Sequence, residues 1–221
     1  MKKRIGLIWF GADCRIEDNN LLIRAARDVE SLICVYLPYQ KISGQDSEMG
    51  FGRSEHNKRF EHQSAANLAQ SLASLEQVLY KPCDLTELAG IIKSQNVTDL
   101  YRAFHPGDYE KEGLQHLMEN CDLEIHTAYS LSLLHESQLP FGKDKLPKTF
   151  TQFRKQVENL AVVRPLPSPD ALPQHIELDV PRVCMLSEVN ASIFYQSTVV
   201  KRKAKNTWLL TSSLSTLKPT S

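Results

Sequence analysis

The sequence predicts an α/β protein with a five-stranded, parallel, doubly wound sheet of the Rossmann-like type. Short apolar runs alternate with amphipathic stretches along the chain, which is the pattern of successive strand–helix units. The apolar runs contain many β-branched and aromatic residues, as expected for strands that helices cover on both faces. The predicted strands are residues 5–10, 32–37, 77–80, 97–103 and 123–127.

The first unit, residues 5–22, is the most informative part of the chain. An apolar run, Ile-Gly-Leu-Ile-Trp-Phe, stops at Gly11 and Ala12. The polar loop that follows contains Asp13, Arg15, Asp18 and Asn19. Asp18 or Asn19 is placed to cap a helix that starts near Asn20. Doubly wound domains bind ligands at the carboxyl ends of their strands, but loop hydrogen bonds and a helix cap are the simpler roles for these residues.

The later helices are predicted from apolar spacing and from their ends. Asp84 caps a helix that runs to about Lys93, and the turn at residues 106–108 leads into a helix over residues 109–119. A long helix over residues 54–75 has one apolar stripe, made of Phe60, Ser64, Leu68, Leu72 and Leu75. Alternating strands and helices predict right-handed crossovers, with helices on both faces of the sheet.

The pattern changes after Ser130, and three parts are expected. Residues 1–135 form the α/β domain. Residues 136–181 form a docking segment, with a helix or turn over residues 150–160, and a stiff proline-rich linker. Residues 182–221 form a basic, Ser/Thr-rich tail that is expected to be poorly ordered.

The composition excludes several classes of protein. The 26 basic and 26 acidic residues balance, and a neutral body is a poor binder of a phosphate backbone. The 5 cysteines have neither metal-ligand spacing nor the pattern of a disulfide framework, so reduced thiols in a cytoplasmic protein are expected. No stretch approaches the roughly 20 apolar residues of a membrane span, and no membrane contact is expected.

Three segments resemble the DNA photolyase/cryptochrome family, most of all its DASH-type cryptochromes, and they occur in the family's order. The first is WF-x-x-D-x-R-x-x-DN-x-x-L at residues 9–22. The second is FGR at residues 51–53, followed by Arg59, Phe60 and a leucine-spaced helix. The third and most specific, FTQFRKQVE at residues 150–158, is similar to the Phe-Thr-x-Phe-Arg-Lys-x-Val-Glu stretch of the DASH type.

The resemblance implies the antenna domain of a blue-light-dependent flavoprotein, either a photoreceptor or a DNA-repair enzyme of the deoxyribodipyrimidine photo-lyase type. In the family this domain helps to hold a light-harvesting chromophore, usually a methenyltetrahydrofolate-type folate and sometimes a deazaflavin or flavin. FAD and DNA are bound by a large helical domain, which the residues after Pro181 do not match. The chain is therefore expected to be truncated before the flavin domain, to be inactive alone, and to meet DNA only through the missing domain.

The resemblance also implies a chromophore site. Where the family holds folate, an acidic residue near the fourth strand and the next helix binds the pterin ring. A carboxylate suits this role because it accepts two parallel N–H bonds from an aminopyrimidine edge. The candidates are Asp108, Glu110 and Glu112, in a segment with the family's Tyr-Glu-x-x-Glu pattern shortened by one residue. Acidic residues in a first helical turn also simply favour the helix dipole, which is the alternative explanation.

Other features narrow the hypothesis. Gly11 and Ala12 stand where the family often has two arginines, which argues against an anionic deazaflavin- or flavin-type antenna at this loop. No catalytic and no metal-ligating residues are predicted. Two further hypotheses stay open: a stand-alone nucleotide- or folate-binding α/β module, and a remnant without a binding function.

Overall fold

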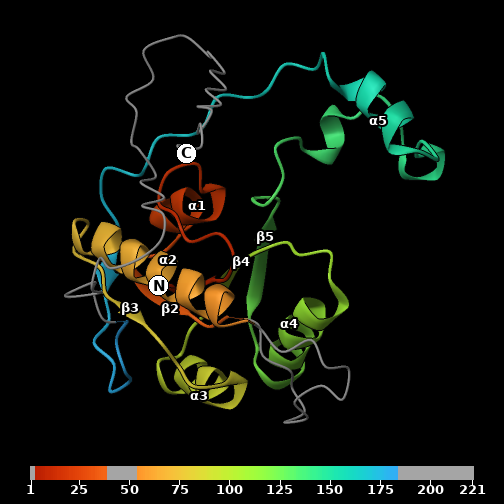
Figure 1. Cartoon of the computed structure of the whole chain (residues 1–221). Coiled ribbons are helices and arrows are strands. Elements are labelled where there is room, and N and C mark those ends of the chain that lie inside the picture. The colour runs from red at the N-terminus through yellow and green to blue at the C-terminus, as the bar shows by residue number, and fades with distance from the viewer. Residues whose placement is uncertain (1–2, 39–53, 184–221) are drawn as a thin grey trace, which may run out of the picture. The chain divides into compact units, whose positions relative to one another are not determined.

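The computed structural model describes residues 3–38 and 54–183, and its centre is a parallel sheet (Figure 1). The strand order is β3-β2-β1-β4-β5, and a short sixth strand also pairs with β2. The strands are β1 (Ile5–Phe10), β2 (Ser31–Tyr36), β3 (Leu79–Tyr80), β4 (Asp99–Ala103), β5 (Glu124–Ala128) and β6 (Gln174–His175). The doubly wound, five-stranded parallel sheet expected from the sequence is confirmed, and β6 is an addition.

Two helices begin directly after residues that the sequence predicts as caps, Asn19 and Asp84. The helices are α1 (Asn20–Asp28), α2 (Glu55–Ala73), α3 (Leu85–Ser94), α4 (Asp108–Asn120) and α5 (Phe150–Val157), with short 3₁₀ turns at Glu136–Gln138 and Lys143–Lys145. Of the two candidate caps of α1, Asn19 is the cap, because its Oδ1 accepts the N–H of Leu22 at 3.1 Å. Asp18 adopts a positive φ of 51° instead, and its N–H donates to the carbonyl of Leu166 at 2.9 Å.

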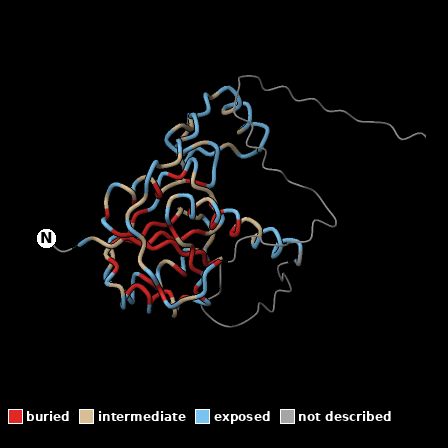
Figure 2. The backbone as a smooth tube through the Cα atoms, turned by 90° about the vertical axis from the view of Figure 1, so that its left-hand side faces the viewer, coloured by how far each residue is buried: buried red, intermediate tan, exposed pale blue. Residues whose placement is uncertain are grey.

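Two hydrophobic cores lie on opposite faces of the sheet. Figure 2 shows the buried residues gathered in the interior of the fold. Successive β1 side chains alternate between them: Ile8 and Phe10 join the core under α1 and α2, whereas Leu7 and Trp9 join the core under α3 and α4. All four side chains are at most 3% exposed. Each such burial contributes about 1.5–3 kcal/mol, so this central strand is a large part of the stability of the domain.

The strand order places a topological switch point between β1 and β4. The chain leaves β1 toward β2 and β3 on one side, and later returns to add β4 and β5 on the other. The helices that follow β1 and β4 consequently lie on opposite faces of the sheet, which opens a crevice outside the carboxyl ends of these two strands. This crevice is where the fold itself favours ligand binding.

Residues 172–183, here called the edge strap, pack against the β2–β3 edge of the sheet. Gln174 and His175 form β6 beside the start of β2, and Arg182 forms an antiparallel bridge with Tyr80. The Tyr80 hydroxyl donates to the carbonyl of Ile176 and accepts the N–H of Leu178, both at 3.1 Å. The sequence predicted only a linker here, because a two-residue strand has no periodicity to detect.

One predicted core position is wrong. The stripe of the long helix was expected to bury Phe60, but this side chain is 65% exposed. Burial of α2 begins one turn later and involves Ala65, Leu68, Ala69 and Leu72. The first turns of α2 therefore contribute no described side chain to the core.

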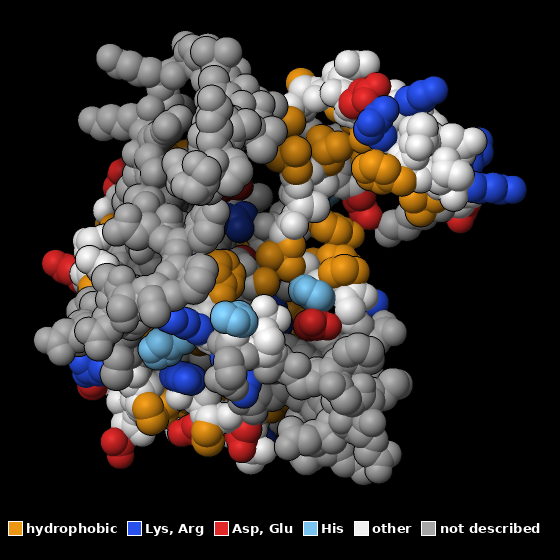
Figure 3. All heavy atoms as spheres, in the orientation of Figure 1, with side chains coloured by type: hydrophobic (Ala, Val, Ile, Leu, Met, Phe, Trp, Pro, Cys, Tyr) orange, Lys and Arg blue, Asp and Glu red, His pale blue; other side chains and the backbone are white. Residues whose placement is uncertain are grey.

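The segment around α5 has a mixed surface. Leu146 and Phe150 are 59% and 76% exposed, and none of the residues of α5 is buried. Figure 3 shows hydrophobic side chains next to basic ones over this segment. Phe141 and Phe153 pack edge to face with ring centroids 5.6 Å apart, so the segment has a small aromatic contact of its own.

We expect Tyr80→Phe to lower the free energy of unfolding by about 1–3 kcal/mol, because the backbone groups of Ile176 and Leu178 lose their partner in a buried place. Urea denaturation followed by circular dichroism measures this loss. Tyr129→Phe is the matched control, since its hydroxyl bonds the exposed carboxylate of Glu136 and its loss should cost within about 0.5 kcal/mol. Equal effects of the two substitutions would show that the edge strap does not depend on Tyr80.

Candidate functional site

A tryptophan and an arginine stack at the switch point. Trp9 of β1 and Arg102 of β4 are register partners on neighbouring parallel strands, so their side chains lie on the same face of the sheet. The guanidinium carbon of Arg102 lies 3.4 Å from the centroid of the Trp9 ring, in a cation–π contact. The indole N–H donates to the carbonyl of Leu37 at 2.9 Å, which fixes the ring beneath the arginine.

The loop after β1 is held by its own hydrogen bonds. Asp13 is 2% exposed, and its Oδ1 accepts the N–H of Gly11 at 3.0 Å. Arg15 donates to the carbonyl of Ser130 at 2.7 Å and to that of Asp18 at 3.1 Å. The polar residues of the Trp-Phe motif thus fasten the loop and the start of α1, and Asp13 additionally places a buried negative charge near Arg102.

A cavity of about 540 Å³ opens beside this pair, between α4 and the carboxyl ends of β4 and β5. Arg102 and Glu110 are two of its charged lining residues, and the apolar side chains of Phe104, Leu114 and Met118 form part of its wall. The remaining lining residues are Ala103, His105, Lys111, Gln115, Glu119 and Thr127. Apolar walls with a few polar groups are typical of sites for small organic ligands.

Arg102 is a buried cation. The residue is only 6% exposed. Burial lowers the pKa of its guanidinium to about 10, while the charges of Asp13 and Glu110 act to raise that pKa. The group is still protonated at neutral pH, since its pKa lies well above 7. The cavity therefore has a permanent positive charge set into its inner wall.

Glu110 lies in the first turn of α4, and its side chain is 22% exposed. Its Oε2 lies 3.4 Å from Nδ1 of His105, and that same nitrogen accepts the N–H of Gly107 at 3.1 Å. A Cβ at position 107 would overlap Glu110 Oε2, so the absence of a side chain at Gly107 leaves the room that the carboxylate occupies.

The structure separates the three predicted chromophore residues. Glu110 lines the cavity. Glu112 is exposed and is not among the lining residues. The side chain of Asp108 lies outside the part of the chain that the structure describes. Sequence reasoning missed Arg102, although a charged residue within the buried run Asp-Leu-Tyr-Arg-Ala is a detectable departure from strand composition.

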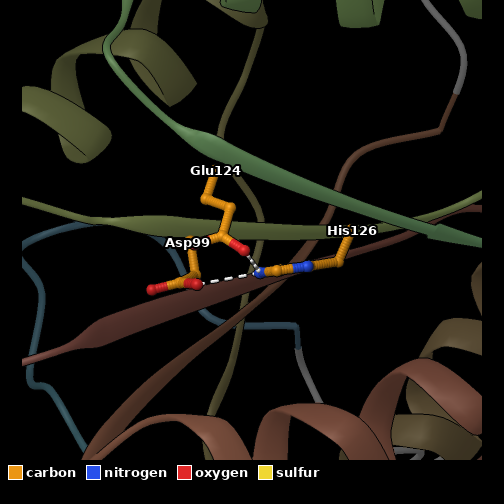
Figure 4. A group of neighbouring side chains, drawn as sticks. All are labelled: Asp99, Glu124 and His126. Carbon is orange, nitrogen blue, oxygen red and sulfur yellow. Dashed lines mark hydrogen bonds and ion pairs between the residues drawn. The ribbon is translucent and has the colours of Figure 1, made fainter.

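A second charged cluster lies at the opposite, amino-terminal end of β4 (Figure 4). It brings together the metal-ligand types Asp99, Glu124 and His126, whose ligand atoms lie within 4.8 Å of one another. The Arg4 guanidinium already bonds both oxygens of Asp99, which also accept from Thr98 Oγ1 at 2.6 Å and pair with His126 Nε2 at 2.8 Å. We interpret this cluster as a closed ion-pair network, because Arg4 supplies its cation.

The network sets the ionisation of Asp99. Burial acts to raise the pKa of this carboxyl, but hydrogen bonds from Arg4, His126 and Thr98 outweigh burial, so the pKa is lowered. A carboxyl with a lowered folded-state pKa stabilises the fold above its unfolded-state pKa. That contribution is lost as the pH falls through the folded-state pKa.

Asp99→Asn is therefore expected to reduce the free energy of unfolding at pH 7 by about 2 kcal/mol. The difference in the free energy of unfolding between the variant and the parent should shrink as the pH falls below about 4. The protonated Asp99 of the parent then resembles the amide of the variant. Urea denaturation at a series of pH values tests this. Asp122→Asn, at an exposed site before β5, is the control with no such trend. A gap that stays constant with pH would contradict the assignment.

The sequence is similar to those of known proteins of one family. The family model described as DNA photolyase matches residues 6–172. Cryptochrome DASH of Vibrio parahaemolyticus is 32% identical over 208 residues, and that of Idiomarina loihiensis is 35% identical over 184 residues. These alignments cover 90% and 78% of this chain but 44% and 40% of the relatives. The chain thus spans less than half the length of these curated relatives.

The family model ends at residue 172. The predicted tail lies beyond that point, and its residues 184–221 are outside the described part of the structure, so its poor order stays a prediction. Among the residues that are described, no helix has both the length and the apolar character that a bilayer crossing requires.

Solved structures share the fold. A cryptochrome from Synechocystis superposes with a TM-score of 0.68 over 82% of this chain and 40% of its own, at 24% identity. The archaeal photolyase from Sulfolobus tokodaii, with two FAD molecules that implicate a novel light-harvesting cofactor, gives 0.61 over 81% and 40% at 20% identity. At such identities the likeness concerns the fold alone. The family match covers most of the sequence, so this chain belongs to the DNA photolyase family, as a cryptochrome-DASH-like α/β domain.

Proposed function

We propose that this domain binds a light-harvesting chromophore in the cavity beside α4, as the antenna part of a blue-light-dependent flavoprotein. The observation that carries the proposal is the Glu110 carboxylate in the wall of a cavity of about 540 Å³, next to the topological switch point. Cavities of roughly 300–1,000 Å³ bind ligands of the size of a fused-ring heterocycle. The family membership supplies the light-harvesting context.

The charges next to Arg102 favour a neutral or cationic ring over an anionic group at this place. Asp13 and Glu110 both act on Arg102 and compensate its positive charge. A further anion beside them would therefore gain little from the arginine. A methenyltetrahydrofolate-type folate could present the N–H edge of its pterin ring to Glu110, whose two oxygens match two parallel donors. A flavin ring, of the kind bound by the Sulfolobus tokodaii photolyase, is the competing ligand to test.

The wider role is proposed from the relatives. The full-length function would be light-driven repair of pyrimidine dimers or light sensing, with FAD and DNA bound by residues beyond those that this chain shares with its relatives. The 221-residue chain by itself would act as an antenna module and not as a lyase. No described residue is assigned a catalytic role.

Glu110→Gln is expected to weaken binding of 5,10-methenyltetrahydrofolate about tenfold, because a charge-assisted pair of hydrogen bonds becomes neutral. Titration followed by the near-ultraviolet absorption of the folate measures the affinity. Glu112→Gln is the matched control, since this residue lies on the same helix but is exposed and outside the cavity. Equal losses in both variants would remove Glu110 from the site.

Gly107→Ala perturbs the same carboxylate without touching its chemistry. The added Cβ would displace Glu110 Oε2, the far end of a flexible side chain, so folate affinity should fall while stability changes within about 0.5 kcal/mol. The same titration of the unaltered chain also separates the other hypotheses. Saturable binding supports an antenna or a stand-alone module, whereas no binding of folate or flavin supports a remnant.

The isolated chain should show no light-dependent cleavage of cyclobutane pyrimidine dimers and should retain no stoichiometric FAD after purification. Repair assays on a dimer-containing oligonucleotide and the visible absorption spectrum provide the measurements. Cleavage, or a flavin band at one molecule per chain, would show that these residues suffice for the family's chemistry.

A further inference from the structure

The guanidinium of Arg102 lines the cavity and makes few hydrogen bonds with the described residues. An arginine side chain carries five N–H donors in a planar fork. Among the residues that the structure describes, the acceptor of Arg102 is the carbonyl of Trp9, at a long 3.5 Å from Nη1. The residue is 94% buried, since it is 6% exposed, and it lines the cavity. The donors that this carbonyl does not use are therefore available to a ligand in the cavity.

The position of this guanidinium is fixed from two sides. Its flat face lies 3.4 Å from the Trp9 ring centroid, and Nη1 and Nη2 pass close to the backbone of Gly11, where a Cβ would lie 3.7 and 3.8 Å from them. Trp9 in turn is bonded to Leu37 and packed by α4, where a Cβ at Gly113 would lie 3.5 Å from the ring. The donors are therefore held in place before any ligand arrives.

The surrounding charges decide which acceptor suits these donors. Asp13 and Glu110 already act on Arg102, so a phosphate or carboxylate of a ligand would add a third negative charge to one positive charge. A neutral carbonyl oxygen accepts the same hydrogen bonds without this repulsion. Lys111 also lines the cavity, and its side chain has other interactions.

We propose that Arg102 is a specificity-determining residue that donates to a ring carbonyl of the bound heterocycle, while Glu110 accepts from the adjacent ring N–H groups. This inference rests on the proposed chromophore site and deepens it. A pyrimidinone ring, common to pterins and flavins, carries a carbonyl directly beside an N–H. Two charged residues of opposite sign in one cavity wall complement that pair of neighbouring groups.

The test uses two probes that differ at the ring carbonyl in question. Folic acid carries an oxygen at C4 and a hydrogen on N3 of its pteridine, whereas aminopterin carries an amino group at C4 and no hydrogen on N3. Arg102→Met is expected to lower the affinity for folic acid about tenfold, because the ring carbonyl loses its donor. The affinity for aminopterin should stay unchanged or rise, because the amino group at C4 then no longer faces the N–H donors of the arginine. Intrinsic fluorescence quenching in the 221-residue chain gives both dissociation constants.

The ratio of the two affinities separates recognition from a structural role. If Arg102 only shapes the site, Arg102→Met changes both affinities by the same factor, and the proposal is overturned. Arg102→Lys retains the charge but not the planar fork, so it should recover only part of the preference for folic acid. If the unaltered chain binds neither probe, the proposed function itself fails. Binding of both with no preference overturns the role of Arg102 alone.

Discussion

The structure depends on β1, which is paired on both edges and buried on both faces. Its parallel pairing with β2 on one side and β4 on the other creates the switch point, and its alternating side chains seed both cores. Gly6 makes the β1–β4 pairing compatible with the helix layer, since a Cβ there would come within 3.0 Å of Val29 and 3.1 Å of Tyr101. The other strands and the helices of the domain are arranged around this central strand.

Strand β4 carries a charged residue near each end, and the two residues differ in how fully they are hydrogen-bonded within the chain. Asp99, at the amino end, has both oxygens occupied by Arg4, Thr98 and His126, so its desolvation is compensated within the chain. Arg102, at the carboxyl end, has one long hydrogen bond and an aromatic face among the described residues. A closed network stabilises a fold, whereas an incompletely bonded charge in a cavity wall is typical of a binding site.

The cavity combines rigid and adjustable parts. Trp9 and Arg102 sit on paired central strands, which hold their geometry within the sheet. Glu110 sits in the first turns of α4, where the space left by Gly107 determines the position of its carboxylate. Ligand sites that place their donors on strands and one ionised acceptor at a helix start bind with little reorganisation, because most of the ordering is already complete in the free protein.

The sequence by itself determined the five main strands, the helices between them, the parallel doubly wound class and the family, because these follow from local periodicity, helix caps and contiguous motifs. It also named Glu110, although it could not distinguish that residue from Glu112, two positions along the same helix. Tertiary structure decided what local patterns cannot encode. Arg102 faces Trp9 only through the β1–β4 register, and the edge strap joins β2 across more than a hundred residues. Phe60 stays exposed because burial of α2 begins at Ala65. Such contacts depend on strand order and register, which are set by the packing of the whole domain.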